Sequence, residues 1–223
     1  APVQEVRIPP PNSIAVLPFE NLSEDPSNEF FSDGISEEIL GLLTRVSSLT
    51  VAARTSSFSF KGQHVDAGTI ARRLNVRHIV EGSVRKSGRQ VRINAQLVEA
   101  DDGYLLWNET YDVTLGDIFA VQDQIATKIV RALAQRMAGP ELPDAVSGGA
   151  RTTDMEAYEL FLLGRHYWTK RGEENVRRSI ALFQAALDRD PDYAEAWAAL
   201  AYAFAVLPAY TQGVNRHTSE RAA

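Results

Sequence analysis

The sequence contains no cysteine and only two methionines among its 223 residues. Without cysteine the chain can form neither disulfide bonds nor thiolate metal sites, and it has no thiol nucleophile. It contains no run of about eighteen apolar residues, so the sequence predicts no transmembrane helix. Lys and Arg total 23 against 29 Asp and Glu, which gives a formal net charge of −6. Because this balance lacks the basic excess that is typical of nucleic-acid-binding proteins, we expect no nucleic-acid partner.

Common catalytic motifs are missing as well. The sequence contains no Gly-x-Ser-x-Gly, no P-loop and no Gly-x-Gly-x-x-Gly segment. His64, His78, His166 and His217 stand in unrelated segments without an HExxH pattern, so packed or surface imidazoles are the simpler interpretation. We therefore predict no enzymatic activity, no cofactor and no metal site in this chain.

The N-terminal segment is rich in proline. Residues 9–11 are three consecutive prolines, which favour a stiff, extended linker over residues 1–12. The first residue is Ala1 rather than methionine, and no apolar signal-peptide core follows it. We expect the chain to be part of a longer polypeptide, cut within this linker.

Residues 13–138 alternate between strand and helix patterns. Helices between the early strands imply parallel pairing, whereas the later hairpins are antiparallel. We therefore expect an α/β domain with a mixed five-stranded sheet and three helices. The predicted elements are, in chain order, a buried strand at 14–19 ended by Pro18, a helix within 28–46, a strand from 49 that runs into a polar loop at 54–57, a helix at 67–74 stopped near Asn75, strands at 78–86, 90–100 and 104–113, and a long helix from Ile118 that Gly139 and Pro140 end.

The C-terminal part of the chain carries only helical patterns. Residues 139–153 are rich in Pro, Gly and Ser and predict a linker. Residues 154–223 resemble tetratricopeptide (TPR) repeats, in which small residues let paired helices approach and aromatic residues fill the gaps between turns. We expect all-α helical hairpins, with one full repeat, a loop at 169–175 about three residues longer than the consensus, and a second repeat whose first helix ends at Pro208. The residues matched to this packing are Gly164, Tyr167, Phe183, Ala186, Pro191, Trp197, Leu200 and Ala201.

Two short segments are candidates for ligand binding. Arg54, Thr55, Ser56 and Ser57 offer a guanidinium and three hydroxyls after a strand, a combination that can cradle a small anion. Hydroxyl-rich loops equally often satisfy their own backbone. Gly82-Ser83 interrupts a strand pattern, which indicates a bulge or the close approach of a ligand or of a neighbouring element.

Several motifs follow one another through the α/β region. They are Ile-Ala-Val-Leu-Pro-Phe at 14–19, Phe-Ser-Asp-Gly-Ile at 31–35 with Glu37 and Glu38, Val-Ala-Ala-Arg-Thr-Ser-Ser at 51–57 with Lys61 and Gly62, Val-Glu-Gly-Ser-Val-Arg at 80–85, Ala-Gln-Leu-Val at 95–98, Leu106-Trp107 and Asp117-Ile118-Phe119. In these motifs residues 13–137 resemble the TolB-like N-terminal domain of bacterial multidomain regulators. The resemblance implies an α/β fold placed next to a nucleotide cyclase or winged-helix output domain, often across a membrane-spanning segment, and ahead of TPR arrays. It implies no catalytic residues.

These patterns predict a non-enzymatic sensory or interaction module of a bacterial signalling or transcriptional regulator, whose output domain lies outside this chain. The sheet domain is expected to bind a small ligand or a partner, or to form a homodimer, and the repeats to bind a protein or peptide in their groove. Two alternatives stay open. One is part of a nucleotide-cyclase-type enzyme, although the acids and cationic clamp of phosphoryl chemistry are not evident. The other is nucleic-acid binding through Arg72, Arg73, Arg77, Arg85, Arg89 and Arg92. The compartment is open between the cytoplasm and the periplasmic face of the inner membrane, with membrane contact only through a segment outside this chain.

Overall fold

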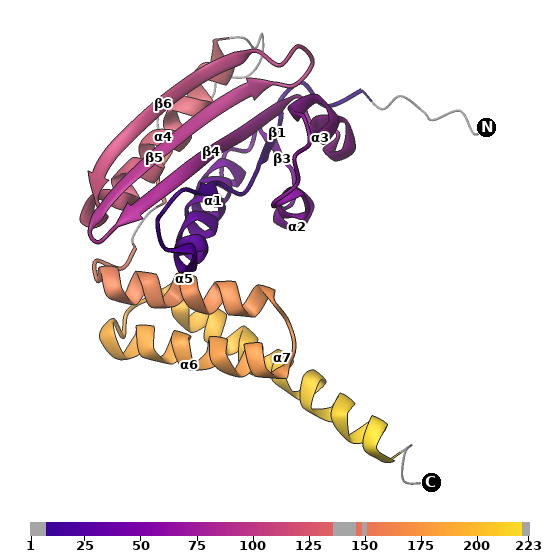
Figure 1. Cartoon of the computed structure of the whole chain (residues 1–223), viewed down its shortest axis with the longest axis vertical. Helices are drawn as coiled ribbons and strands as arrows, with labels where there is room; N and C mark the ends of the chain where they lie inside the picture. The colour runs from indigo at the N-terminus through magenta and orange to yellow at the C-terminus, as the bar shows by residue number, and fades with distance from the viewer. Residues whose placement is uncertain (1–7, 136–145, 149–150, 220–223) are drawn as a thin grey trace, which may run out of the picture. The chain divides into compact units, whose positions relative to one another are not determined.

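The computed structural model describes residues 8–135, 146–148 and 151–219, with side chains described up to Thr211. The chain divides into two compact units, 1–149 and 150–223, which are drawn in Figure 1. The division falls within the segment 139–153 that the sequence predicts as a linker. Most of that segment, and the predicted helix stop at Gly139 and Pro140, lie outside the described residues.

The first unit is built on one mixed six-stranded sheet. β1 runs parallel to β3 and β4, whereas β4, β5 and β6 form an antiparallel meander. The mixed sheet is thus confirmed, but it has six strands rather than five. The extra strand follows Pro18, which has no amide hydrogen; pairing along β4 breaks there and resumes at Glu20. The sheet order is β3 (Thr50–Val51), β1 (Ser13–Val16), β4 (His78–Ser87), β5 (Gln90–Glu99) and β6 (Leu105–Thr114), with β2 (Glu20–Asn21) also paired to β4.

Four α-helices belong to the described part of this unit, one more than the three expected. α1 (Glu29–Thr44) and α4 (Ile118–Ala134) pack together, and α3 (Ala67–Leu74) lies on the other face of the sheet (Figure 1). The additional helix is α2 (Arg54–Ser57), where the sequence predicts a polar loop. Ser57 and Phe60 are buried. Tertiary packing therefore stabilises a helical turn that the hydroxyl-rich sequence does not predict.

Local sequence signals set several element ends as expected. The carboxylate of Asp66 accepts a hydrogen bond from the amide of Thr69 at 2.8 Å and caps α3. Hydrogen bonding to the side chain of Thr69, and then to its amide, holds the pKa of Asp66 below its usual range. Asn75 ends the same helix in the left-handed conformation, with φ of 54°. Gly88, with φ of 56°, forms the tight turn between β4 and β5.

The second unit consists of α5 (Met155–Thr169), α6 (Glu173–Arg189) and α7 (Ala194–Ser219), and α6 packs against both other helices. The predicted helical hairpins are present. The helix stop at Pro208 is wrong, because α7 continues through it to Ser219. A proline removes one backbone hydrogen bond, a loss that a helix can absorb as a local kink instead of ending.

The residues matched to repeat packing fall into two groups. Gly164, Phe183, Ala186 and Leu200 are buried between the helices. Pro191, Trp197 and Ala201 are exposed, and Tyr167 is half-buried. Trp197 donates a hydrogen bond from its indole to the carbonyl of Pro191 at 2.8 Å. Among the described residues no further helix packs on the face of α7 that carries Trp197 and Ala201.

Asp154 caps the first helix of this unit, and its substitution gives a prediction. Its carboxylate accepts a hydrogen bond from Arg189 at 3.1 Å and from the amides of Ala157 and Glu156, both at 2.9 Å. These interactions, with Arg189 the largest, hold the pKa of Asp154 below its usual value. We expect Asp154→Ala to lower the free energy of unfolding by about 1 kcal/mol, and Asp154→Asn, which keeps a capping oxygen, by less. Urea unfolding measures both.

The same carboxylate predicts a pH dependence. Because the folded pKa of Asp154 is depressed, its contribution is full above the unfolded value near 3.8 and is lost as pH falls through the folded pKa. The difference in stability between the wild type and Asp154→Ala should therefore shrink as pH falls below about 3.8. An unfolding difference that stayed constant across this range would contradict the assignment.

Candidate functional site

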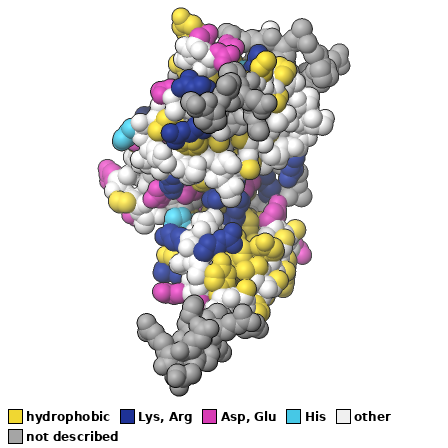
Figure 2. Space-filling view, turned by 90° about the vertical axis from the view of Figure 1, so that its right-hand side faces the viewer, with side chains coloured by type: hydrophobic (Ala, Val, Ile, Leu, Met, Phe, Trp, Pro, Cys, Tyr) yellow, Lys and Arg dark blue, Asp and Glu magenta, His cyan; other side chains and the backbone are white. Residues whose placement is uncertain are grey.

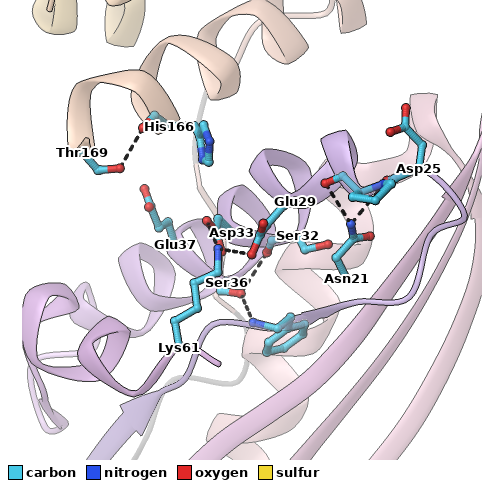
Figure 3. Close-up of polar contacts among 12 residues, drawn as sticks. Asn21, Asp25, Glu29, Ser32, Asp33, Ser36, Glu37, Lys61, His166 and Thr169 are labelled. Atoms are coloured by element: carbon cyan, nitrogen blue, oxygen red, sulfur yellow. Dashed lines mark hydrogen bonds and ion pairs between the residues drawn. The ribbon is translucent and has the colours of Figure 1, made fainter. Parts of the chain in front are cut away.

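The site begins at the break between β1 and β2. The amide of Phe19 donates to the hydroxyl of Ser36 on α1 at 2.8 Å, and that hydroxyl donates to the carbonyl of Ser32 at 2.9 Å (Figure 3). Phe19 is buried at this point, with only 2% of the residue exposed. A Cβ at Gly82 of β4 would lie 2.9 Å from this ring. The same Cβ would lie 2.2 Å from the backbone oxygen of Asn94, so the interruption of the strand pattern at Gly82 reflects the close approach of both β5 and Phe19.

Beyond this point one face of the sheet is polar. Residues paired across an antiparallel sheet point to the same side, so Glu81 and Ser83 of β4 share a face with Asn94 and Gln96 of β5. Gln96 donates to Glu81 at 2.6 Å, and Asn94 donates to Thr110 of β6 at 3.0 Å. On the same face α3 packs over Ile79, at the start of β4. The polar residues lie further along the strand, beyond this apolar cluster.

A cavity of about 750 Å³ opens where the polar face meets the segment before α3. Three carboxylates line it, those of Glu20, Glu29 and Glu81, together with the basic side chains Lys61 and His64. Its size falls in the range of small-molecule sites, which combine apolar walls with a few polar groups. The remaining lining residues are Leu17, Pro18, Phe19, Asn21, Ser23, Pro26, Phe60, Gly62, Gln63, Val65, Ile70, Gly82, Ser83, Asn94 and Gln96.

Two basic residues, Lys61 of the cavity lining and Arg54, form ion pairs with acidic residues of α1. Lys61 contacts Asp33 at 2.6 Å and Glu29 at 2.8 Å, and Figure 3 shows its side chain reaching toward both. Arg54 contacts Glu37 one turn further along the helix. Asp33 and Glu37 are almost buried, so their charges depend on these partners. Asp33 and Glu37 belong to the sequence motif at 31–38, and Arg54 and Lys61 belong to the motif at 51–62, so the ion pairs join these two motifs.

The structure separates the four residues predicted to cradle an anion. The guanidinium of Arg54 is engaged by Glu37 and stacks on the ring of Phe58 at 4.2 Å. Ser57 is fully buried, whereas Thr55 and Ser56 are exposed. The second predicted pair, Gly82 and Ser83, lines the cavity. Anion binding at 54–57 remains a prediction.

The arginines proposed as a basic face are engaged in different ways. Arg92 forms a two-pronged ion pair with Asp112 at 2.6 and 2.9 Å. Arg85 donates to the carbonyl of Leu22, and Arg72 to the hydroxyl of Thr69. Arg73 stacks on the ring of Phe60 at 5.9 Å. Much of the charge on this face is therefore used within the unit.

Sequence reasoning missed most of the cavity residues. Glu81, Asn94 and Gln96 stand at the polar positions of alternating strands, which marks them as solvent-facing without separating a site from an ordinary surface. Lys61 and His64 lie in a loop whose path follows from packing. Across 8–135, 146–148 and 151–219, no three His, Asp or Glu side chains gather in a way that could hold a metal ion. In the same residues no helix is long and apolar enough to cross a membrane.

Comparison with known proteins identifies the first unit. The sequence model of the second domain of HilA/YgeH-like transcriptional regulators matches residues 11–128. The chain belongs to this family. The match covers the whole sheet, α1 to α3 and most of α4, and so includes every residue that lines the cavity.

A longer relative extends the match into the second unit. The present chain is 41% identical over 194 residues to a protein of Rhizobium meliloti (strain 1021) named "Putative adenylate cyclase 3". The alignment covers 87% of this chain and 33% of that protein. The chain thus spans about one third of this relative's length. Together the two matches support a regulatory or signalling module.

Solved structures match parts of the chain at low identity. TolB from Acinetobacter baumannii is 18% identical with a TM-score of 0.42, covering 58% of this chain and 29% of that one. Lipoprotein GNA1162 from Neisseria meningitidis is 19% identical with a TM-score of 0.40, covering 46% and 80%. The C-terminal domain of LpoB from Salmonella enterica is 14% identical with a TM-score of 0.39, covering 48% and 85%.

Proposed function

We propose that this chain is a non-enzymatic sensory and interaction module of a bacterial regulator, acting on an output domain outside it. The first unit binds a small ligand in the cavity, and the second unit, as TPR-type hairpins, binds a protein or peptide. The observation that carries the proposal is the cavity of about 750 Å³ beside the polar face of the sheet. Family membership supports the regulatory setting.

The charges of the cavity favour a cationic ligand. Glu20, Glu29 and Glu81 contribute three negative charges, and the one lysine in the lining, Lys61, already contacts Glu29 and Asp33. Amide groups of Asn94 and Gln96 add hydrogen-bonding capacity beside Glu81. An organic amine or amidine of small-molecule size complements this lining, since charge-assisted hydrogen bonds to carboxylates are strong.

Titration with organic cations tests the proposal. We expect spermidine and arginine amide to raise the melting temperature of the first unit and to show saturable heat in calorimetry, whereas citrate and AMP do not. Glu81→Gln should weaken binding about tenfold, because it removes the carboxylate partner of a charge-assisted bond. Asp112→Asn makes the same charge change on the same face outside the cavity and serves as the control. Equal loss in both variants, or no response to any cation or anion, would refute a ligand site here.

A second candidate function is a place within a nucleotide-cyclase-type protein. The name of the 41% identical relative favours it. In that setting we propose that this chain regulates the cyclase and does not itself catalyse. ATP turnover by the isolated chain at the level of a cyclase would overturn this assignment.

A further inference from the structure

A cluster of cations and aromatic rings lies at the turn between α5 and α6. We call it the basic loop surface and define it as Tyr167, Trp168, Lys170, Arg171 and Arg178. The ammonium of Lys170 lies 5.1 Å and the guanidinium of Arg178 4.1 Å from the centre of the Tyr167 ring. The guanidinium of Arg171 lies 5.2 Å from the Trp168 ring. Figure 2 shows Lys and Arg side chains beside an apolar surface on the helical unit.

The three cations of this surface have no carboxylate partner among the described residues. Elsewhere in the unit arginines are paired: Arg177 contacts Glu173 at 2.9 Å, and Arg189 contacts Asp154 at 3.1 Å. Lys170, Arg171 and Arg178 are instead exposed and held over rings. The dipole at the end of α5 favours cations there, but Arg178 lies in the second turn of α6, near the opposite pole. Helix electrostatics therefore account for Lys170 and Arg171 but not for Arg178.

Arg171 also occupies an unfavourable backbone conformation. Its φ is 57°, in the left-handed region where glycine or asparagine usually ends a helix. A glycine is available at the next position, Gly172, which itself has φ of 86°. The carbonyl of Arg171 accepts a hydrogen bond from Asn175 at 2.8 Å, which holds the turn in place. For a residue other than glycine such a position costs stability, and backbone strain of this kind is often found at binding sites.

We propose that the basic loop surface binds an acidic peptide segment of a partner protein. The inference rests on the proposed interaction role of the second unit and names the chemistry of its partner. A guanidinium stacked on a ring is already ordered and keeps its in-plane N–H groups free for two-pronged bonds to Asp or Glu. Nucleic-acid sites instead leave aromatic faces open for bases to stack. Here cations lie over the Tyr167 and Trp168 rings, which favours carboxylates.

Fluorescence anisotropy on the full chain tests this inference. The probes are fluorescein-labelled Glu/Ser, Gln/Ser and Lys/Ser peptides of equal length and a short thymidine oligonucleotide. We expect the Glu/Ser peptide to bind at least tenfold more tightly than the others, with affinity falling as salt rises. Arg178→Gln and Arg171→Gly should each weaken its binding about tenfold. Arg177→Gln is the matched control, because the ion pair with Glu173 already engages that side chain, and should change affinity less than about twofold.

The outcomes separate this inference from the proposed function. Arg171→Gly relieves the left-handed strain, so the melting temperature of this variant should stay level or rise while its affinity for the Glu/Ser peptide falls. A fall in both the melting temperature and the affinity would mean that Arg171 has a structural role, and it would overturn the inference. Equal binding of the Gln/Ser and Glu/Ser peptides would overturn the acidic partner and leave the interaction role standing. Binding of no peptide would count against both. Tighter binding of the oligonucleotide would replace the peptide with a nucleic acid.

Discussion

Replacement of Gly82 by alanine should lower the free energy of unfolding of the first unit by about 3 kcal/mol. The added Cβ would lie 2.2 Å from the backbone carbonyl oxygen of Asn94 and 2.9 Å from the ring of Phe19. The carbonyl belongs to the neighbouring strand and cannot rotate away, and the ring is buried on a residue whose backbone amide is bonded to Ser36. The backbone of β4 must therefore shift, which disturbs the wall of the cavity as well.

Gly41 provides a control of the opposite sign. It lies inside α1, and a Cβ there would meet nothing within 4 Å. Gly41→Ala should therefore raise stability by about 0.5–1 kcal/mol, because alanine loses less backbone entropy in a helix. Urea unfolding followed by circular dichroism measures both variants. A Gly82→Ala protein as stable as the wild type would show that β4 and Phe19 are not packed as described.

The sequence predicts the long elements of the first unit well, for a physical reason. In β5, Val91, Ile93 and Ala95 alternate with polar residues, so the strand and its buried face follow from period alone. The helix over α1 and the stop of α3 at Asn75 follow from apolar spacing and from a residue suited to the left-handed region. Local chemistry and the final fold agree at these positions.

The elements that sequence reasoning missed are short and depend on contacts between distant segments. β2 has two residues and exists because Pro18 interrupts pairing along β4. α2 has four residues, and nothing in Arg-Thr-Ser-Ser favours a helix over a turn. Ser57 is buried there and Arg54 is held by Glu37, seventeen positions earlier in the chain.

The candidate site illustrates the same limit. Gly82 is recognisable in the sequence as a point of close approach, but its neighbour could not be named. The structure identifies two neighbours, the Asn94 carbonyl and the ring of Phe19, and the backbone amide of Phe19 is held by Ser36 of α1. The cavity combines residues from 17 to 96, and its carboxylates Glu20, Glu29 and Glu81 come from three separate segments. Only the tertiary arrangement shows that their charges add.

In the second unit, Gly164→Ala should lower the free energy of unfolding by about 2 kcal/mol. A Cβ at Gly164 would lie 2.5 Å from Cε1 and 2.7 Å from Cδ1 of Phe183. That ring is 1% exposed and packs against Phe161, with centroids 5.9 Å apart, so it has no free space to enter. Alanine gains up to about 1 kcal/mol of helix propensity over glycine, which offsets part of the clash.

A double-mutant cycle with Phe183→Leu isolates the contact. Leucine ends at its Cδ atoms and lacks the Cε1 and Cζ atoms, two of the three ring atoms that an alanine methyl at position 164 would approach, so the clash is smaller in that background. We expect Gly164→Ala to cost about 1 kcal/mol less in the Phe183→Leu variant than in the wild type, in thermal or urea unfolding of the full chain. Additive effects would mean that α5 and α6 do not meet at this pair. Strong coupling would establish that the spacing of these two helices is set by a glycine against a ring, as the sequence pattern predicts.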